Sequence, residues 1–493
     1  MKSFRAICLI LISAIVLVSC DLNRPTLEDK NSISIAYAEA ISSYSPLDFE
    51  AKNRKYLANI YESLVRYDKS FNYDTGLSIS WGRKDDYTWE FKLREGAQFH
   101  DGSAFDAEDA VYSLNLARND PESQLGSLLS TISDVRKVDT YKIEIQTSEP
   151  DPLLLNKLTS VYMIPNEYKD FLTPMGTGPY YLNGFEDRTL TLKRFPNYYG
   201  AMPYYENVNL VFIPDIQERL DAILSGQIDV LANVPPQYFS RLEEAGIDTQ
   251  VFPSLEVSYL MLNFNSALSD PNLRKAIWYA LSTDFTGEVG AGFLLPTNQF
   301  AALGIFGYDP SINDRQQDLF KAQTARNMFE GDVNLNLYVP IGLDDLGYNI
   351  ANDLKEISVN VTVNVLDMPE FQQEILSGDA DMYFFGWKYD LADVSDFFET
   401  VIHSKDQQYG EFNGINYANS EVDDLIEKAS QILNVQQRRK ILGEITDLIL
   451  DDTIAVPLFE SEVVYGFSPD VHWSVRLDGQ ILASEILGNV VQY

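Results

Sequence analysis

The chain has 493 residues, of which 45% are hydrophobic and 12% aromatic, so it can bury the cores of two or three domains and is not a disordered chain. Its 73 acidic residues outnumber its 37 basic residues, and the formal net charge is −36 at pH 7. Such an acidic surface repels nucleic acids and anionic lipid, which excludes nucleic-acid binding as an expected function.

The amino end has the pattern of a bacterial secretion signal. Lys2 and Arg5 precede an apolar run over residues 6–18, which is too short to cross a bilayer comfortably. Ser19 and Cys20 follow this run directly. That arrangement is typical of a lipobox, in which the cysteine is acylated and becomes the mature amino terminus.

This pattern predicts three segments. Residues 1–19 are expected to be a lipoprotein signal peptide, Cys20 to anchor the protein to the membrane through its lipid, and residues 20–31 to form a polar tether. The other cysteine, Cys8, is removed with the signal peptide, so no disulfide bond is expected. The body of the protein is then expected to be extracytoplasmic.

The first predicted elements of the mature chain are a strand over residues 32–37 and a helix that ends within residues 60–68. In residues 89–93 apolar and charged side chains alternate, which predicts a half-buried strand. Asp106 then caps a helix, with Asp109 at the acidic position of a capping box. The apolar face of this helix is predicted to consist of Ala110, Val111, Leu114 and Ala117.

The rest of the chain also mixes helices and strands, which indicates an α/β or α+β protein. Its predicted elements are a Gly/Pro loop at 176–179 that opens a strand at Tyr180, a helix that ends at Gly226 before a strand, a strand over 259–265, a helix from Asp270 to Leu281, a strand over 381–385, a helix capped by Ser420, a helix over 441–449 and a strand over 452–459.

The segment from Trp89 to Ser113, WEFKLREGAQFHDGSAFDAEDAVYS, resembles the signature of bacterial solute-binding protein family 5, whose members serve ABC importers. The matching residues are Phe91, Leu93, Arg94, Gly96, Phe99, His100, Asp101, Gly102, Ala107, Glu108, Asp109 and Ser113. Further segments that resemble family motifs follow in order, namely GTGPY, FPNYY, LSGQIDV and DPNLRKAIWYAL. The resemblance therefore extends from about residue 33 to the carboxyl end.

The resemblance implies an α/β fold of the bilobal periplasmic-binding-protein type (type II, cluster C), with an extra inserted small domain and a hinge that the chain crosses twice. The solute would lie between the two lobes. The implied domains are a lobe I main domain of residues 32–52, 172–267 and 465–493, an inserted small domain of residues 53–171, and a lobe II of residues 268–464.

Residues 386–398, GWKYDLADVSDFF, resemble the family's binding-site motif, in which an acid three residues after the tryptophan pairs with the α-ammonium of a bound peptide. The resemblance gives this role to Asp390, although Val394 stands where the family has proline. Burying an ammonium group is costly unless a carboxylate pairs with it, and a fixed carboxylate also sets the register of the peptide. The other candidate ligand-binding residues are Trp387, Tyr389, Asn263, Asn265 and Tyr180.

The residue pattern does not indicate catalysis or a metal centre. His100, His403 and His472 are isolated from one another and from any cysteine, and the chain has no Ser/His/Asp set or phosphate-binding glycine loop. We therefore expect no enzymatic activity, no cofactor and no metal. Because some family members carry nickel through a small chelator and one histidine, His403 keeps a nickel chelate open as an alternative solute.

The resemblance implies a monomeric, lipid-anchored protein that captures short peptides between its lobes and delivers them to the permease subunits of an ABC importer. Alternatives within this class are a nickel chelate, an oligosaccharide or an opine-like compound. An adhesin or chaperone lipoprotein on the same scaffold would instead bind a large partner. The sequence shows no partner for the carboxyl end of a peptide, and Arg274 is expected to form a salt bridge that joins domains.

Overall fold

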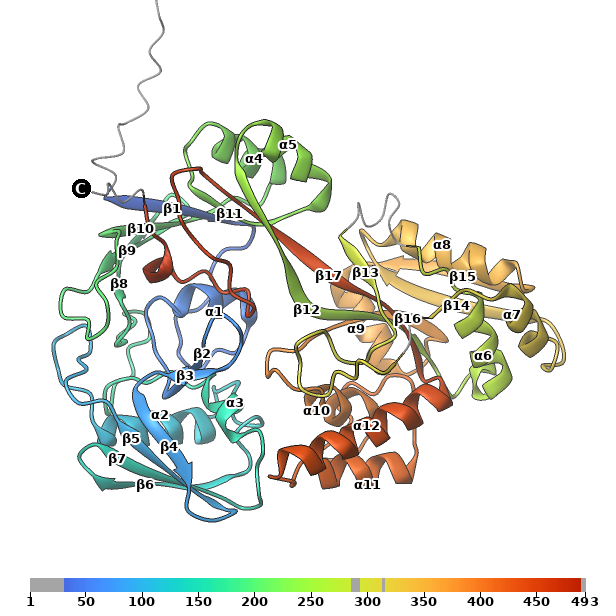
Figure 1. Cartoon of the computed structure of the whole chain (residues 1–493), viewed down its shortest axis with the longest axis horizontal. Coiled ribbons are helices and arrows are strands. Elements are labelled where there is room, and N and C mark those ends of the chain that lie inside the picture. The colour runs from blue at the N-terminus through green and yellow to red at the C-terminus, as the bar shows by residue number, and fades with distance from the viewer. Residues whose placement is uncertain (1–30, 285–292, 313–314, 489–493) are drawn as a thin grey trace, which may run out of the picture.

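The computed structural model describes residues 31–284, 293–312 and 315–488. Within these ranges the chain forms two lobes that are joined by two long strands (Figure 1). Lobe I contains the described residues before Asp248 and after Phe467, whereas lobe II contains those of residues 263–454.

The predicted signal peptide, Cys20 and all of the predicted tether except Asn31 lie outside the described residues. Asn31 itself is held against lobe I, because its carbonyl accepts the backbone N–H groups of Glu206 and Asn207. No helix in the described part of the chain combines the length and the apolar character that a membrane span needs.

One eleven-stranded sheet runs through both lobes in the order β15-β14-β16-β12-β17-β11-β1-β10-β9-β8, with β13 paired to β17 at the side. Strands β12 (Asp248–Leu262) and β17 (Ala455–Phe467) pass from one lobe to the other and are antiparallel partners over most of their length. These two strands are the double crossing that the sequence predicts.

The main domain of lobe I contains five strands of this sheet, and the predicted strand over 32–37 is confirmed as β1. The strands are β1 (Ser32–Tyr37), β8 (Tyr180–Glu186), β9 (Thr189–Arg194), β10 (Asn207–Phe212) and β11 (Val230–Val234). The helices are α1 (Ala51–Leu57), α4 (Ile216–Leu224), α5 (Phe239–Glu244) and the short turns η2 (Pro236–Tyr238) and η5 (Ala483–Glu485). The predicted strand at Tyr180 and the predicted helix end before Gly226 are both confirmed.

The inserted small domain is built on a four-stranded antiparallel sheet in the order β4-β5-β7-β6. Its elements are β2 (Val65–Tyr67), β3 (Tyr73–Thr75), β4 (Ser78–Arg83), β5 (Thr88–Leu93), α2 (Ala107–Asn119), β6 (Ile132–Asp139), β7 (Lys142–Thr147) and α3 (Leu154–Leu158). The predicted capping box of α2 is confirmed, since Asp106 accepts the N–H of Glu108 and Asp109 accepts the N–H of Asp106 at 2.8 Å.

The prediction of a helix end within residues 60–68 is wrong. Helix α1 already ends at Leu57, and residues 65–67 form strand β2, which pairs with β3. The pairing with a strand further along the chain overrides the local pattern, which contained no information about that partner.

Lobe II surrounds the other half of the sheet with helices. Its elements are η3 (Ala267–Ser269), α6 (Pro271–Ala280), β13 (Leu294–Pro296), α7 (Leu319–Arg326), β14 (Val333–Pro340), α8 (Asp344–Lys355), β15 (Val359–Leu366), α9 (Met368–Ser377), β16 (Met382–Lys388), α10 (Ser395–Phe397), η4 (Phe398–Ile402), α11 (Ser420–Ala429) and α12 (Val435–Asp452). Asp270 caps α6 as predicted. The cap of α11 is Asn419, one residue before the predicted Ser420, because the Asn419 side chain accepts the N–H of Glu421.

The hydrophobic cores of the main and small domains meet within residues 47–65. Tyr56 and Tyr61 pack with Ile33 in the core of the main domain, whereas Leu64 and Val65 pack in the core of the small domain. Leu47, which precedes residue 53, also packs in the core of the small domain, so the boundary at residue 53 stays a prediction.

The crossing strand β12 is irregular where it passes between the lobes. Its pairing with β17 shifts between Pro253 and Val257, and Leu255 within this stretch has a φ of 59°, in the left-handed region. Such a bulge bends a strand, and a left-handed residue other than glycine costs on the order of 1 kcal/mol. The bend lies at the cavity described next, where Ser254 and Glu256 form part of its wall.

Candidate functional site

A cavity of about 450 Å³ lies between the lobes at the crossing strands, and we refer to it as the interlobe cavity. Lobe I lines it with α1, β2, residues 159–162 and residues 479–484. The crossing strands add residues 253–256 and 463–465, and the end of β16 adds Lys388 and Asp390 from lobe II. A cavity of this size suits a small ligand.

Asp390 lies in the wall of the interlobe cavity, directly after the end of β16. Its side chain is 52% exposed, and its carboxylate is 3.1 Å from the ammonium of Lys388. The Glu256 carboxyl on β12 lies close enough to interact electrostatically with Lys388 and Asp390. Burial raises the pKa of Glu256, Lys388 lowers it and Asp390 raises it. The wall on the lobe II side is therefore a small group of opposite charges.

Trp387 and Tyr389 point the other way. Side chains alternate along a strand, so residues 387 and 389 face the core of lobe II while residues 388 and 390 face the cavity. The Tyr389 hydroxyl is buried, donates to the carbonyl of Phe300 and lies 2.7 Å from the hydroxyl of Tyr259. The ring of Trp387 stacks on Phe385 with a centroid separation of 6.1 Å.

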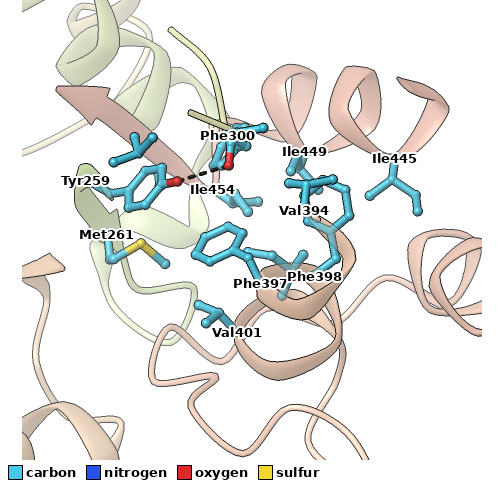
Figure 2. Close-up of a cluster of buried hydrophobic side chains, with 14 of the residues drawn as sticks. Tyr259, Met261, Phe300, Val394, Phe397, Phe398, Val401, Ile445, Ile449 and Ile454 are labelled. Carbon is cyan, nitrogen blue, oxygen red and sulfur yellow. Dashed lines mark hydrogen bonds between the residues drawn. The ribbon is translucent and has the colours of Figure 1, made fainter. Parts of the chain in front are cut away.

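The core of lobe II next to residues 387–390 is rich in aromatic side chains. Figure 2 shows the ring of Phe397 inside the cluster, near Tyr259 and Met261. The rings of Phe397 and Tyr259 are stacked with centroids 5.1 Å apart, and the Trp387 ring meets Phe397 edge-on at 5.9 Å. Trp387 and Tyr389 therefore pack in the core of lobe II, next to the backbone that carries Asp390.

Asn263, Asn265 and Tyr180 also lie away from the interlobe cavity. The buried amide of Asn263 donates to the carbonyl of Gly378 at 2.8 Å and accepts the N–H of Asn265 at 2.9 Å. Asn265 is exposed beyond the end of β12. Tyr180 is buried in the lobe I core, where its hydroxyl donates to the carbonyl of Tyr205 at 3.1 Å. The structure does not bring these residues together with Asp390.

The signature residue His100 fixes the loop Gly176–Gly178. The N–H of Gly176 donates to Nδ1 of His100 at 3.3 Å, and Nε2 of His100 is 3.0 Å from the carbonyl of Gly178. Burial lowers the pKa of His100 to about 4, so the ring is neutral at pH 7 and Nε2 carries the donated proton. A Cβ on Gly176 would lie 2.1 Å from the carbonyl oxygen of Ile60, so this position requires glycine.

Glu62 joins two of the segments that resemble family motifs, GTGPY and FPNYY. Its buried carboxyl receives the hydroxyl groups of Thr177, Tyr198 and Tyr199 at 2.9, 3.0 and 2.7 Å. Burial raises the pKa of Glu62, while the three hydroxyl groups lower it. These segments therefore converge at one joint between the main and small domains, and Glu62 and Tyr198 also line the interlobe cavity.

Sequence reasoning missed the cations of α1. Lys52, Arg54 and Lys55 all line the interlobe cavity from lobe I. Burial lowers the pKa of Lys55, although the carboxylate of Glu39 at 3.3 Å opposes this effect. The signal available in the sequence was the short basic run at 52–55 within a strongly acidic chain.

Arg274 and His403 have local roles in lobe II. Nε of Arg274 donates to the carbonyl of Asp452 at 2.8 Å, and its guanidinium also donates to the carbonyl of Leu268. The predicted domain-joining salt bridge is therefore wrong, because Arg274 binds backbone carbonyls within one lobe. His403 is buried, is stacked on Tyr409 at 4.4 Å and does not line the cavity. In the described ranges no three His, Cys, Asp or Glu residues are grouped so as to hold a metal ion.

The lobes also contact each other beside Asp390. The side-chain amide of Asn156 on α3 donates to the carbonyl of Leu391, and the hydroxyl of Tyr67 on β2 is 3.5 Å from the same oxygen. The small domain therefore reaches the loop that carries the candidate carboxylate.

Known proteins resemble this chain over most of its length. The dipeptide-binding protein of Escherichia coli (strain K12) is 23% identical over 433 residues, which cover 79% of this chain and 81% of that protein. The nickel-binding protein NikA of Staphylococcus aureus is 23% identical over 401 residues, which cover 78% of this chain and 80% of that protein.

The solved structure of the periplasmic binding protein DppA from Helicobacter pylori, in complex with the peptide STSA, has a TM-score of 0.77 at 22% identity and covers 93% of this chain and 98% of that chain. This similarity confirms the bilobal α/β fold of periplasmic binding proteins. The sequence model described as bacterial extracellular solute-binding proteins, family 5 Middle, matches residues 73–409. The chain therefore belongs to family 5 of the bacterial extracellular solute-binding proteins.

Proposed function

We propose that this protein captures short peptides in the interlobe cavity and delivers them to the permease subunits of an ABC importer, without a chemical step. The observation that carries the proposal is the position of Asp390, whose carboxylate lies in the wall of a cavity between the lobes. The relative named for dipeptides and the similar structure that holds STSA support a peptide as the solute.

The pairing of Asp390 with a peptide amine follows from simple electrostatics. An ammonium group that leaves water needs a carboxylate partner, and Asp390 is fixed at the end of a strand whose next side chains are packed in a core. Before a peptide binds, Lys388 neutralises Asp390 at 3.1 Å. The ammonium group of the peptide then takes the place of the Lys388 ammonium beside Asp390, so the Asp390 carboxylate keeps a positively charged partner.

The location of the protein is part of the same proposal. Cys20 carries the lipid, residues 1–19 are removed, and the folded lobes lie outside the cytoplasmic membrane as a monomer on a short tether.

The test is to measure peptide affinity by calorimetry for the wild type and for Asp390→Asn, with a peptide first identified by native mass spectrometry of the protein after exposure to a mixture of short peptides. Because Asp390→Asn removes the carboxylate but keeps the shape, we expect affinity to fall at least about tenfold. An N-acetylated form of the same peptide should bind weakly to both proteins.

The matched control is Asp379→Asn, which removes an exposed carboxylate of lobe II outside the cavity lining and should leave the affinity unchanged. Equal affinity of Asp390→Asn and the wild type would remove the amine-binding role of Asp390. If the mixture yields a single non-peptide mass, such as a metal chelate, or no bound mass, the peptide function itself is wrong.

A further inference from the structure

The interlobe cavity differs in charge from the rest of the chain. Six basic and five acidic residues line it, whereas the whole chain has about two acidic residues for each basic one. The basic residues of the lining are Lys52, Arg54, Lys55, Arg66, Lys388 and Arg476. Cations are therefore more frequent in the lining of the interlobe cavity than in the chain as a whole, and they attract an anionic group of a ligand.

Five of these six cations already have a carboxylate partner. The pairs are Lys52 with Glu50 at 2.6 Å, Lys55 with Glu39 at 3.3 Å, Arg66 with Asp74 at 2.9 Å, Lys388 with Asp390 at 3.1 Å and Arg476 with Asp478 at 2.7 Å. Arg54 is the exception, because it forms no ion pair with any residue in the described part of the chain. Among the residues that the structure describes, its guanidinium makes one hydrogen bond, from Nη1 to the carbonyl of Asp48 at 3.3 Å.

The guanidinium of Arg54 is held in place by aromatic rings. It lies 4.3 Å from the ring centre of Tyr162 and 5.6 Å from that of Phe49. The neighbouring Asn53 is buried and bonds to Asp48 at 2.8 Å, which fixes α1 against the loop before it. An arginine side chain has five N–H donors in a rigid fork that matches a carboxylate, so Arg54 has donors left for a ligand.

Lys55 adds a second positive charge next to Arg54. Burial lowers the pKa of Lys55, Glu39 raises it and Lys388, facing it from lobe II, lowers it. An anion bound between these groups would offset the repulsion between Lys55 and Lys388. The cations Arg54 and Lys55 of α1 therefore favour a negatively charged ligand group. The carboxylate of Asp390 on the opposite lobe favours a positively charged one.

We propose that Arg54, assisted by Lys55, binds the C-terminal carboxylate of the captured peptide and makes the protein selective for peptides with a free carboxyl end. This inference rests on the proposed peptide-binding function. Asp390 of lobe II and Arg54 of lobe I then hold the two charged ends of one ligand, so a zwitterionic peptide connects the two lobes.

The test uses the full chain in detergent and two equimolar libraries of random tri- to pentapeptides that differ in one respect, a free or an amidated C-terminus. Native mass spectrometry measures how much of each library is captured. We expect the wild type to prefer free-acid peptides about tenfold, which is about 1.4 kcal/mol. Arg54→Gln should capture both libraries about equally, and Arg54→Lys, which keeps the charge but loses the fork, should show an intermediate preference.

Arg241→Gln is the matched control, since Arg241 is an arginine of lobe I that is paired with Asp221 and does not line the interlobe cavity, and its preference should equal that of the wild type. A wild type that captures both libraries equally, or an unchanged preference in a folded Arg54→Gln variant, overturns the carboxylate subsite and leaves the peptide function standing. If the wild type enriches acidic peptides within the amidated library and Arg54→Gln does not, the anion is a side-chain carboxylate and the C-terminal assignment is wrong. Capture of neither library overturns the proposed function, and the subsite with it.

Discussion

At the scale of single residues, the site depends on which face of β16 each side chain occupies. Lys388 and Asp390 face the interlobe cavity, and Trp387 and Tyr389 face the core of lobe II. The resemblance to family 5 predicts a binding role for Asp390, and the two-residue period of a strand places Trp387 and Tyr389 on the opposite face. With that period, the sequence would have placed Tyr389 in the core once β16 was known to continue to Lys388.

Tyr389→Phe tests this assignment. The substitution removes a buried hydroxyl that lies between the Phe300 carbonyl and the Tyr259 hydroxyl, so the free energy of unfolding should fall by about 1 kcal/mol. The affinity for peptide should not change, because the side chain does not reach the cavity. Chemical denaturation and calorimetry measure the two quantities, and a weaker peptide affinity at unchanged stability would place Tyr389 in the site.

At the scale of elements, the segments that carry the resemblance form a joint. His100, Glu62 and the loop Gly176–Gly178 belong to distant parts of the sequence but are bonded to one another where the small domain meets the main domain. The residues of the family signature therefore reflect the architecture of lobe I. They do not report on the solute, which is why the fold was easier to predict than the site.

Gly176→Ala should damage this joint. The new Cβ would be 2.1 Å from the carbonyl oxygen of Ile60, so the loop must move, and we expect a loss of more than about 2 kcal/mol of stability. Gly184→Ala in the adjoining strand β8 is the control, because nothing lies within 4 Å of its added Cβ. Thermal unfolding compares the two variants, and equal melting temperatures would show that the loop is not tightly held.

At the scale of the whole molecule, two carboxyl groups of lobe II that interact electrostatically with Lys157 of lobe I have pKa values raised toward neutral pH. Burial raises the pKa of Asp396 to about 7, the charges of Asp390 and Asp393 raise it and Lys157 on the small domain lowers it. Burial also raises the pKa of Glu399 to about 8, with Lys157 again opposing the shift. Lys157 is on α3 of lobe I, so these carboxyl groups of lobe II are shielded from water at the contact between lobes.

The sign of the pH effect follows from these raised pKa values. Below the unfolded-state pKa of about 4 the two carboxyl groups are protonated in both states, and as the pH rises through 7 and 8 the folded state must ionise groups that are shielded from water. Their contribution to stability is therefore lost between about pH 4 and pH 8. We expect Asp396→Asn to change the stability least near pH 4 and to stabilise the protein progressively as the pH rises, by more than about 1 kcal/mol at pH 8.

The measurement is the difference in melting temperature between the wild type and Asp396→Asn from pH 5 to pH 8, which cancels the general repulsion within a chain of net charge −36. Asp379→Asn, with an exposed carboxylate in the same lobe, should show no such trend. Parallel pH profiles for the wild type and Asp396→Asn would mean that Asp396 does not titrate with a raised pKa.

The sequence by itself determined the family, the bilobal α/β fold, the strand β1 and the cap of α2. These features can be predicted from local patterns, because strand alternation, helix caps and short motifs involve residues that are close together in the sequence. Only the tertiary structure decided that α1 brings Arg54 and Lys55 to the cavity and that Tyr180 and Asn263 stay in the cores of their lobes. Arg54 and Asp390 are separated by more than 300 residues, and no local pattern states that a folded chain will place them on opposite walls of one cavity.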